Sequence, residues 1–554
     1  MNAQSKPETP KQAAARTENP AVEGGEPQSP TPDTAAWPRM DGVGVAAVLV
    51  TLIVLAVIMI PRLPPGVCFH DSGELQLAST VLGIVHAPGY PGYVSLGYLA
   101  TLVPGVDPAY MVTLAYLLAG FAVICLLIMM QVRLGGEPLI ACGIVFAFVA
   151  VPRVWENVIT PEAYTPSLAF SAGAAYLLFR YTRLGRRRDL YWAAFLFGIA
   201  LGNRPPVLFA LPFFVLGWWI ARKKWDRSWR ESGRTFGILL GCAIVPIVYS
   251  LAYLYLRDTI ATPYNYLENI YHESGQIPPL SNGWQAKVER VIYHTTGREF
   301  SYAMGNSWDE ICDKGRWIYN EFFMYQPVKL VLVLVAVVGG AVIAFRRCAV
   351  ASWVLTGLAL ASLIFIFAYG MYGQAADYMP LVWVAYILGG LSLSWVMARL
   401  RERPRRLISV ALAAAAGTFV VWESRTWPGP GLGDDATDYL EAFDMAALPE
   451  DAVICTKWPE IPPLYYAKFV LTDRRDIQLI PAHDTHWLRL MRRYTDRPIF
   501  LTRSSKPVRH LKLTPCRFRV LEDPARPNRG AERRGTLLWR VDPDQRLDPT
   551  NPPR

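Results

Sequence analysis

The sequence predicts a polytopic α-helical membrane protein of roughly eleven spans, followed by a small C-terminal α/β domain on the exported side. Hydrophobic residues make up 52% of the 554 residues and charged residues only 18%, a balance unusual for a soluble protein. Apolar runs that approach the ~20 residues needed to cross a bilayer recur between residues 42 and 421. Short β-rich runs replace them after residue 429.

The chain divides into three predicted parts. Residues 1–38 are rich in Pro, Ala, Glu, Gln and Thr without apolar periodicity, which is typical of a disordered tail. Residues 39–428 form the transmembrane domain, with long exported loops at 61–108 and 257–326. The predicted spans are Gly42–Ile60, Ala109–Met130, Leu139–Val151, Pro166–Phe179, Tyr191–Leu201, Val207–Ile220, Phe236–Leu256, Val328–Phe345, Ser352–Tyr369, Met379–Met397 and Leu407–Val421.

The basic residues predict the orientation. Arg186–Arg188, Arg222–Lys224, Arg346–Arg347 and the run Arg399–Arg406 fall on one side of the membrane if the spans alternate, and such clusters mark the cytoplasmic side. The N-terminal tail is therefore expected in the cytoplasm, and the protein in the plasma (inner) membrane among its lipids. Topology accounts for the net charge of +10, so nucleic acid is not an expected partner.

Residues 429–554 are expected to form the exported α/β domain. Ala452–Cys455, Ile477–Ile480 and Ile499–Leu501 are predicted strands, and Pro463–Leu471 and Thr485–Tyr494 are predicted helices. The last ~30 residues, charged and proline-rich, are predicted to be a loose tail. No catalytic spacing occurs there, so the expected role is acceptor recognition or structural packing.

The first exported loop carries the densest polar cluster. His70-Asp71-Ser72-Gly73-Glu74-Leu75 and then Gly83–Pro91 place two carboxylates and two histidines directly after the first span. Charged groups are costly near lipid, so such a cluster indicates a functional site. Asp71 or Ser72 could instead cap a short helix, a role that does not exclude chemistry.

These motifs resemble the signature of a large multi-pass membrane family, once known only as a domain of unknown function. Its animal member is an endoplasmic-reticulum protein O-mannosyltransferase. The resemblance covers about residues 40–400 and rests on three blocks in the family's order. They are Asp71–Leu75 with Leu82–Ile84, His86 and Pro88–Pro91; Trp155–Asn157 with Pro161–Tyr164; and Ala376–Pro380. The chain departs from the family at Ala87, at Arg204-Pro205-Pro206 and at Thr456-Lys457-Trp458.

The resemblance implies the GT-C glycosyltransferase architecture. It also implies inverting transfer of a sugar, mannose or similar, from a polyprenyl-phosphate donor to a hydroxyl on an exported protein, glycan or lipid. No cofactor is implied, because the lipid-linked sugar is a substrate. The sequence leaves a divalent metal open but gives no sign of a site for one.

Asp71 is the expected catalytic base, since a lipid-linked sugar presents its anomeric carbon near the emergence of the first span. Glu74 lies one helical turn away, where it orients the base, binds the acceptor or only caps a helix. Arg204, and then Arg153, are candidates to stabilise the leaving phosphate. Each could instead be a snorkelling arginine at the interface.

Four further residues complete the predicted donor or acceptor site. His86 is expected to bind the donor phosphate or sugar, in a pocket shaped by the turn that contains Tyr90. Glu162 is expected to line the cleft as another carboxylate. Asp377 has the same expected role, or it pairs with an arginine and locks helices together.

Two other classes of protein stay open. A transporter or flippase of lipid-linked sugars would need ionisable or broken-helix sites near mid-membrane, and the middles of the predicted spans are nearly free of charge. Pro205, Pro206 and Pro246 could still break helices. A non-catalytic scaffold that displays the exported domain would not depend on Asp71.

Overall fold

The computed structural model describes residues 40–226, 228–259, 262–268, 283–323, 327–369, 375–425, 436–481, 494, 496–502, 513–521 and 533–541. The predicted N-terminal tail, residues 1–38, lies outside these ranges, as does nearly all of the predicted helix Thr485–Tyr494. Parts of the loop 257–326 and of the predicted C-terminal tail also lie outside them.

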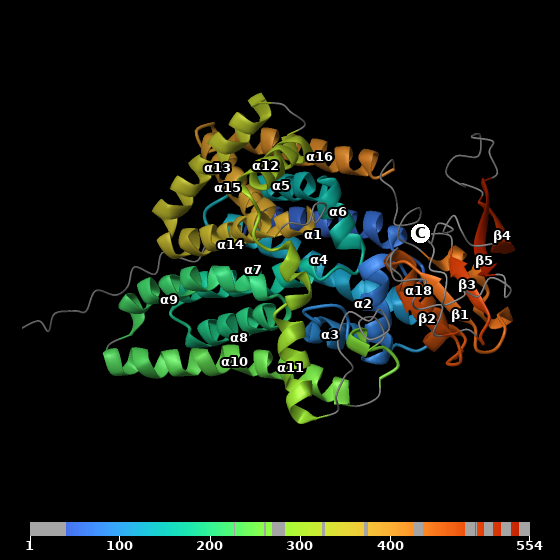
Figure 1. The fold of residues 1–554 in the computed structure, drawn as a ribbon. Coiled ribbons are helices and arrows are strands. Elements are labelled where there is room, and N and C mark those ends of the chain that lie inside the picture. Colours follow the sequence, from blue (N-terminus) through green and yellow to red (C-terminus); the bar gives the residue numbers. More distant parts are fainter. Residues whose placement is uncertain are drawn as a thin grey trace, which may run out of the picture. The chain divides into compact units, whose positions relative to one another are not determined.

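The described chain between residues 40 and 425 is almost entirely helical (Figure 1). Its helices are α1 Gly42–Met59, α2 His70–Val81, α3 Pro91–Thr101, α4 Pro108–Arg133, α5 Pro138–Val149, α6 Pro152–Ile159, α7 Tyr164–Leu184, α8 Arg187–Asn203, α9 Leu211–Trp225, α10 Trp229–Thr259, α11 Trp284–Thr295, α12 Trp308–Phe323, α13 Pro327–Arg347, α14 Ala349–Ala368, α15 Met379–Met397 and α16 Glu402–Glu423.

All eleven predicted spans are helical, but fewer helices could each cross a bilayer. Within the described ranges, eight helices are long and apolar enough, or nine if the bent pair α5 and α6 counts as one span. By length and composition alone, this count is lower than the predicted roughly eleven, because α5 has only 12 residues, α8 has 17, and α7 is more polar than the counted helices. α7 and α8 pack against each other, and α7 also packs against α4.

Local sequence explains where several helices start and stop. The side chains of Asp41 and Asp107 accept hydrogen bonds from Gly44 N (2.8 Å) and Tyr110 N (3.1 Å), which caps α1 and α4. α5 and α6 both begin with proline, a residue suited to the first helical position. The break before the proline that begins α6 accompanies a bend of 85° between the two helices.

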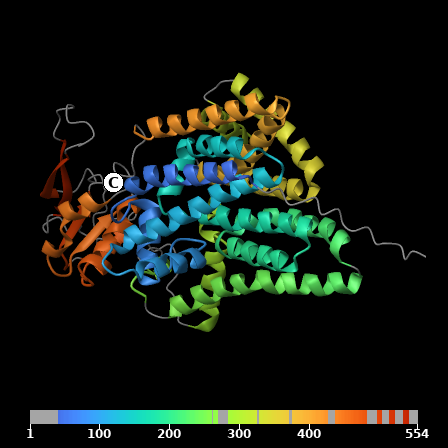
Figure 2. The ribbon, with the colours of Figure 1, turned by 180° about the vertical axis from the view of Figure 1, so that it is seen from behind.

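The two short helices α2 and α3 belong to the predicted first loop, and they lie at the end of the bundle beside the C-terminal domain. Figure 2 shows them in blue next to the orange strands and helices. Their residues share one hydrophobic core with that domain, which includes Leu75, Tyr93, Ile454 and Leu464. The first loop is therefore held between the helical bundle and the C-terminal domain.

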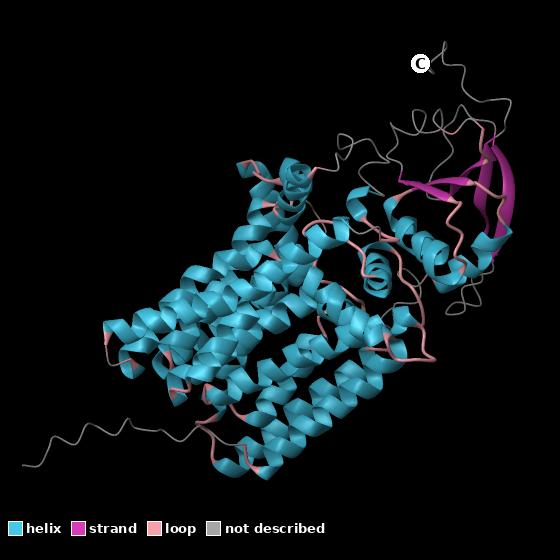
Figure 3. Cartoon of the chain, turned by 90° about the horizontal axis from the view of Figure 1, so that it is seen from below, coloured by secondary structure: helices cyan, strands magenta, loops and turns pink. Residues whose placement is uncertain are grey.

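The C-terminal domain contains the strands, shown in magenta in Figure 3. Its elements are α17 Thr437–Phe443, β1 Val453–Thr456, α18 Ile461–Tyr466, β2 Gln478–Pro481, β3 Ile499–Thr502, β4 Leu513–Leu521 and β5 Arg533–Val541. The sheet order is β2-β1-β3-β5-β4. β1 pairs in parallel with β2 and β3, and β5 pairs in antiparallel fashion with β3 and β4.

The three predicted strands coincide with β1, β2 and β3, and the predicted helix from Pro463 to Leu471 coincides with α18 and the π-helical turn after it. β4 and β5 were not predicted. β5 lies inside the segment that the sequence predicts to be a loose tail. The sequence did not indicate a strand here because arginines flank the short, mostly apolar stretch Thr536–Trp539. Pairing with β3 and β4 brings this stretch into the sheet.

Candidate active site in the first loop

α2 carries the two predicted carboxylates of the first loop in different environments. Asp71 lies in its first turn and Glu74 one turn later, so both share a face as predicted. The Asp71 side chain is 43% exposed, whereas the Glu74 side chain is fully buried. Only Asp71 is therefore open to a substrate.

Glu74 is held by three donors. The backbone N–H of His86 donates to Oε1 (2.9 Å), the Tyr264 hydroxyl donates to the same oxygen (2.7 Å), and the His86 ring bonds Oε2 through Nδ1. Of the roles that the sequence left open for Glu74, this geometry favours orientation over acceptor binding, because no oxygen of the carboxylate faces solvent.

His86 lies between both carboxylates. Its Nε2 is 3.8 Å from Asp71 Oδ2, while its Nδ1 bonds Glu74. Burial alone would lower the pKa of His86, but Glu74 and Asp71 outweigh burial and raise this pKa to about 10. A protonated ring at neutral pH places an N–H beside the accessible carboxylate.

The backbone around these residues adopts an uncommon conformation. The backbone φ angles of His70, Leu82 and Tyr90 are positive, at 56°, 51° and 42°. Residues other than glycine seldom adopt positive φ angles. The loop is also tied to the segment 262–268, because Ile84 N donates to Tyr264 O (3.0 Å) and Tyr266 N donates to Ile84 O (2.9 Å). Such strain concentrates at functional sites.

The second predicted loop contributes residues that the sequence analysis missed. The Tyr266 hydroxyl donates to Glu299 Oε1 (2.7 Å), and the Tyr266 ring lies 6.2 Å from that of His86. Burial raises the pKa of Glu299 to about 7. His294 bonds the carbonyl of Val85 (2.8 Å), and burial lowers its pKa to about 3, so it is neutral. No spacing in the sequence connects these residues to the first loop.

The C-terminal domain also reaches the site. Trp458, in a 3-10 turn after β1, donates its indole N–H to Asp71 Oδ1 (2.8 Å). The only sequence signal for this contact was the turn Thr456–Trp458, at which the chain departs from the family. The two residues are 387 positions apart.

Glu162 and Tyr90 are two further predicted residues near α2. The Ser72 hydroxyl donates to Glu162 Oε1 (2.8 Å), so this predicted carboxylate contacts the helix that carries Asp71. Burial raises the pKa of the Tyr90 hydroxyl, Arg204 opposes this effect, and Asp71, Asp377 and Glu162 add to it. Tyr90 is therefore within electrostatic range of all four predicted residues.

Arg204 and Asp377 form a buried ion pair, with side chains 13% and 6% exposed. The Arg204 guanidinium also lies over the ring of Tyr164, 4.3 Å from its centroid. Asp377 thus pairs with an arginine, one of the two roles expected for it. The pair joins the end of α8 to the turn before α15.

Arg153 has a different setting. Its Nη1 bonds Glu156 Oε2 (3.0 Å) on the same short helix α6, and both side chains are about two-fifths exposed, at 42% and 41%. Its role at a phosphate stays a prediction.

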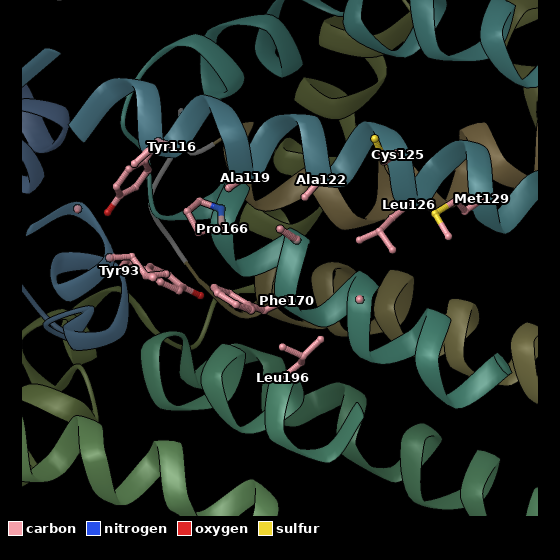
Figure 4. Close-up of a pocket in the computed structure, with 15 residues that line it drawn as sticks. Tyr93, Tyr116, Ala119, Ala122, Cys125, Leu126, Met129, Pro166, Phe170 and Leu196 are labelled. Carbon is pink, nitrogen blue, oxygen red and sulfur yellow. The ribbon is translucent and has the colours of Figure 1, made fainter. Parts of the chain in front are cut away.

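An apolar cavity of about 430 Å³ runs between α3, α4, α7 and α8. Figure 4 shows Tyr93 and Tyr116 at one end and Leu126 and Met129 at the other. Tyr93 stacks on Tyr90, with ring centroids 6.2 Å apart, which connects this end to the polar site. Among the described residues, none that lines the cavity is charged.

Among the described residues, no group of three or more His, Cys, Asp or Glu side chains is arranged to hold a metal ion. The described residues therefore offer no candidate site for the divalent metal that the sequence left open.

Comparisons with known proteins identify a similar family and a similar fold. Residues 71–228 match the family model described as the protein O-mannosyl-transferase TMEM260 N-terminal domain. The chain is also 28% identical over 236 residues to protein O-mannosyl-transferase TMEM260 of Mus musculus, a match that covers 41% of this chain. These matches confirm the resemblance to the O-mannosyltransferase-like membrane family that the sequence motifs indicated. The match spans only 32% of the mouse protein.

The fold resembles that of ArnT from Cupriavidus metallidurans. The apo structure of ArnT matches 90% of this chain and 98% of its own, with a TM-score of 0.54 and 12% identity. The structure of ArnT bound to undecaprenyl phosphate matches with the same score and 13% identity. This likeness confirms the predicted GT-C-like membrane fold with its small C-terminal sheet domain.

Proposed function

We propose that this protein is a membrane glycosyltransferase. It moves a sugar, mannose or similar, from a polyprenyl-phosphate donor to a hydroxyl group on an exported protein, glycan or lipid. The observation that carries the proposal is Asp71, an accessible carboxylate fixed between Trp458 and His86 at the start of α2. The names of the similar proteins, an O-mannosyl-transferase and a protein that binds undecaprenyl phosphate, support the same reaction class.

The proposed reaction is a single displacement at the anomeric carbon. The acceptor oxygen forms a bond to this carbon while the bond from carbon to phosphate oxygen breaks, and the electron pair leaves with polyprenyl phosphate. Asp71 takes the acceptor proton, a transfer that requires hydrogen-bond distance between hydroxyl and carboxylate. Attack from the face opposite the leaving group inverts the configuration.

Arg204 is proposed to stabilise the phosphate as its negative charge grows. A guanidinium carries five N–H donors, and the bond to Asp377 uses one of them. Asp377 and Tyr164 hold the Arg204 guanidinium in position before the donor binds. Little reorganisation of this group is therefore needed in the transition state. No cofactor takes part in this scheme.

The apolar cavity is proposed to hold the first part of the isoprenoid chain. Its volume of about 430 Å³ falls in the range of ~300–1,000 Å³ found for small-molecule sites. Tyr93 lies at its end and stacks on Tyr90, so a lipid tail in the cavity would leave its phosphate close to Arg204. A carrier of lipid-linked sugars would also use such a cavity, but it would not need a positioned base.

The proposed topology places the first loop and the C-terminal domain outside the cytoplasm and the N-terminal tail inside it, in the plasma (inner) membrane. This orientation rests on the basic clusters between spans. Donor and acceptor would then meet on the exported face.

The test uses purified wild-type protein in sealed lipid vesicles, radiolabelled polyprenyl-phosphate mannose and an envelope extract as acceptor. We expect label in the protein or glycan fraction that depends on both donor and enzyme. Polyprenyl-phosphate glucose serves as a second donor that reports sugar preference. If neither donor gives transfer, but the donor moves across the bilayer, the protein is instead a carrier of lipid-linked sugars.

A further inference from the structure

Trp458 of the C-terminal domain contacts Asp71. The indole N–H of tryptophan is a donor only, and here it donates to Asp71 Oδ1 at 2.8 Å. The other oxygen, Oδ2, faces His86 Nε2 at 3.8 Å. Two groups from distant parts of the chain therefore determine how the carboxylate is turned.

Trp458 is itself held firmly. Its ring meets those of His86 and Tyr266 edge-on, with centroids 6.2 Å and 5.7 Å away. Aromatic pairs favour such edge-to-face arrangements. Since His86 and Tyr266 belong to the two loops, Trp458 packs against both of them and is partly buried between them.

The turn that carries Trp458 is fixed by the sheet. Thr456, the last residue of the buried strand β1, donates its hydroxyl to Glu460 Oε2 (2.9 Å) and bonds the Thr502 hydroxyl of β3 (2.7 Å). These bonds close the turn on both sides of Trp458. The direction of the indole is thus set by the C-terminal domain.

The domain is also docked closely on α2. A Cβ on Gly73 of α2 would lie 3.4 Å from Pro462 of α18, which is van der Waals contact. Ala436 N donates to Val67 O (2.8 Å) at the start of the domain. These two contacts hold the domain against the segment that carries Asp71.

We propose that Trp458 is a positioning residue for Asp71, so that the C-terminal domain completes the active site rather than only packing beside it. This inference rests on the proposed transferase function. The hydrogen bond holds Oδ1 and leaves Oδ2 to accept the acceptor proton. Loss of the N–H lets the carboxylate rotate away from the attacking hydroxyl and slows the chemical step, while the donor still binds.

The test compares Trp458→Phe with wild type in the transfer assay. Phenylalanine keeps an aromatic ring for packing on Tyr266 but has no N–H. We expect kcat to fall roughly 10- to 100-fold, the range for a lost hydrogen bond to a charged group, with the KM for the donor within about twofold. Trp308→Phe, at a residue of α12 that is 75% exposed, is the matched control and should match wild type.

A double-mutant cycle separates positioning from folding. If Trp458 acts through Asp71, Trp458→Phe lowers transfer in the wild-type background but adds little to Asp71→Asn. A purely structural role would lower transfer by the same factor in both backgrounds and would lower the thermal midpoint. Wild-type kcat in Trp458→Phe overturns this inference alone, whereas a wild-type protein that transfers no sugar overturns the proposed function as well.

Discussion

Arg204 and Asp377 form a buried ion pair across 173 residues of sequence, between the end of α8 and the turn before α15. Removing one partner of such a pair leaves an uncompensated buried charge, which costs about 3–5 kcal/mol. Any test of Arg204 at the donor phosphate must therefore remove both charges together.

The double variant Arg204→Gln/Asp377→Asn keeps two neutral groups that can hydrogen-bond, so the fold should persist. We expect the KM for the donor to rise and kcat to fall, by roughly 10²-fold in kcat/KM, because a phosphate ligand acts in the ground state and the transition state. Steady-state transfer at varied donor concentration measures both. Arg153→Gln provides the comparison; a larger loss in this variant than in the double variant would move the phosphate site to α6.

Asp71→Asn keeps the size of the side chain and removes the basic carboxylate. We expect transfer to fall by ~10²–10⁴-fold, the usual contribution of a general base. The capping role that the sequence left open for Asp71 or Ser72 is not observed, because α2 begins after Phe69 without a side-chain cap. Donor binding and protein level should hold, since Asp71 is 43% exposed and asparagine keeps an oxygen that can accept from Trp458. Transfer close to wild type in Asp71→Asn would exclude this residue as the base and make Glu162 the next carboxylate to test.

Glu299 gives a prediction for stability against pH. Burial raises its pKa from 4.5 to about 7, so the folded state binds more protons than the unfolded state between these values. Stability from this group is present below pH 4.5 and is lost as pH rises through 7. Glu299→Gln cannot ionise, yet its amide oxygen can still accept from Tyr266.

The thermal midpoint of Glu299→Gln should therefore exceed that of wild type at pH 8 and match it more closely at pH 5. Scanning fluorimetry in detergent at both pH values checks this difference. Glu441→Gln, at an exposed carboxylate of α17, controls for general loss of acidic groups. An equal offset at both pH values would mean that Glu299 does not titrate in this window.

Cysteine accessibility tests the proposed topology. Arg475 in the C-terminal domain and Arg188 at the start of α8 are 73% and 70% exposed. In intact cells, with the native cysteines replaced, a membrane-impermeant maleimide should label Arg475→Cys, and should label Arg188→Cys only after permeabilisation. The reverse pattern would place Asp71 in the cytoplasm and remove the basis of the proposed reaction.

The helical fold could be predicted from sequence because apolar length is a local property. Each predicted span, from Gly42–Ile60 to Leu407–Val421, is helical. What local patterns could not distinguish was a helix that crosses the bilayer from one that packs inside the bundle. The apolar runs Pro166–Phe179 and Tyr191–Leu201 lie in α7 and α8. As whole helices, α7 contains more polar residues and α8 fewer residues than the helices counted as candidate spans.

The candidate site was predictable only where its residues are close in sequence. Asp71, Glu74 and His86 lie within one loop, and their contacts follow from helical spacing and a short return of the chain. Trp458 and Glu299 reach the same place through tertiary packing. Their sequence neighbourhoods carry no spacing that points to α2, so only the three-dimensional structure connects them.

The contact between Asp71 and Trp458 has a consequence for biosynthesis. The ribosome makes Asp71 early and must add 387 more residues before its indole partner exists. While the bundle helices are being inserted, the carboxylate lacks the group that turns it. If Trp458 acts as inferred, the nascent chain gains full activity only when β1 and the turn after it have folded, so a prematurely terminated product would bind the lipid-linked sugar but transfer it slowly.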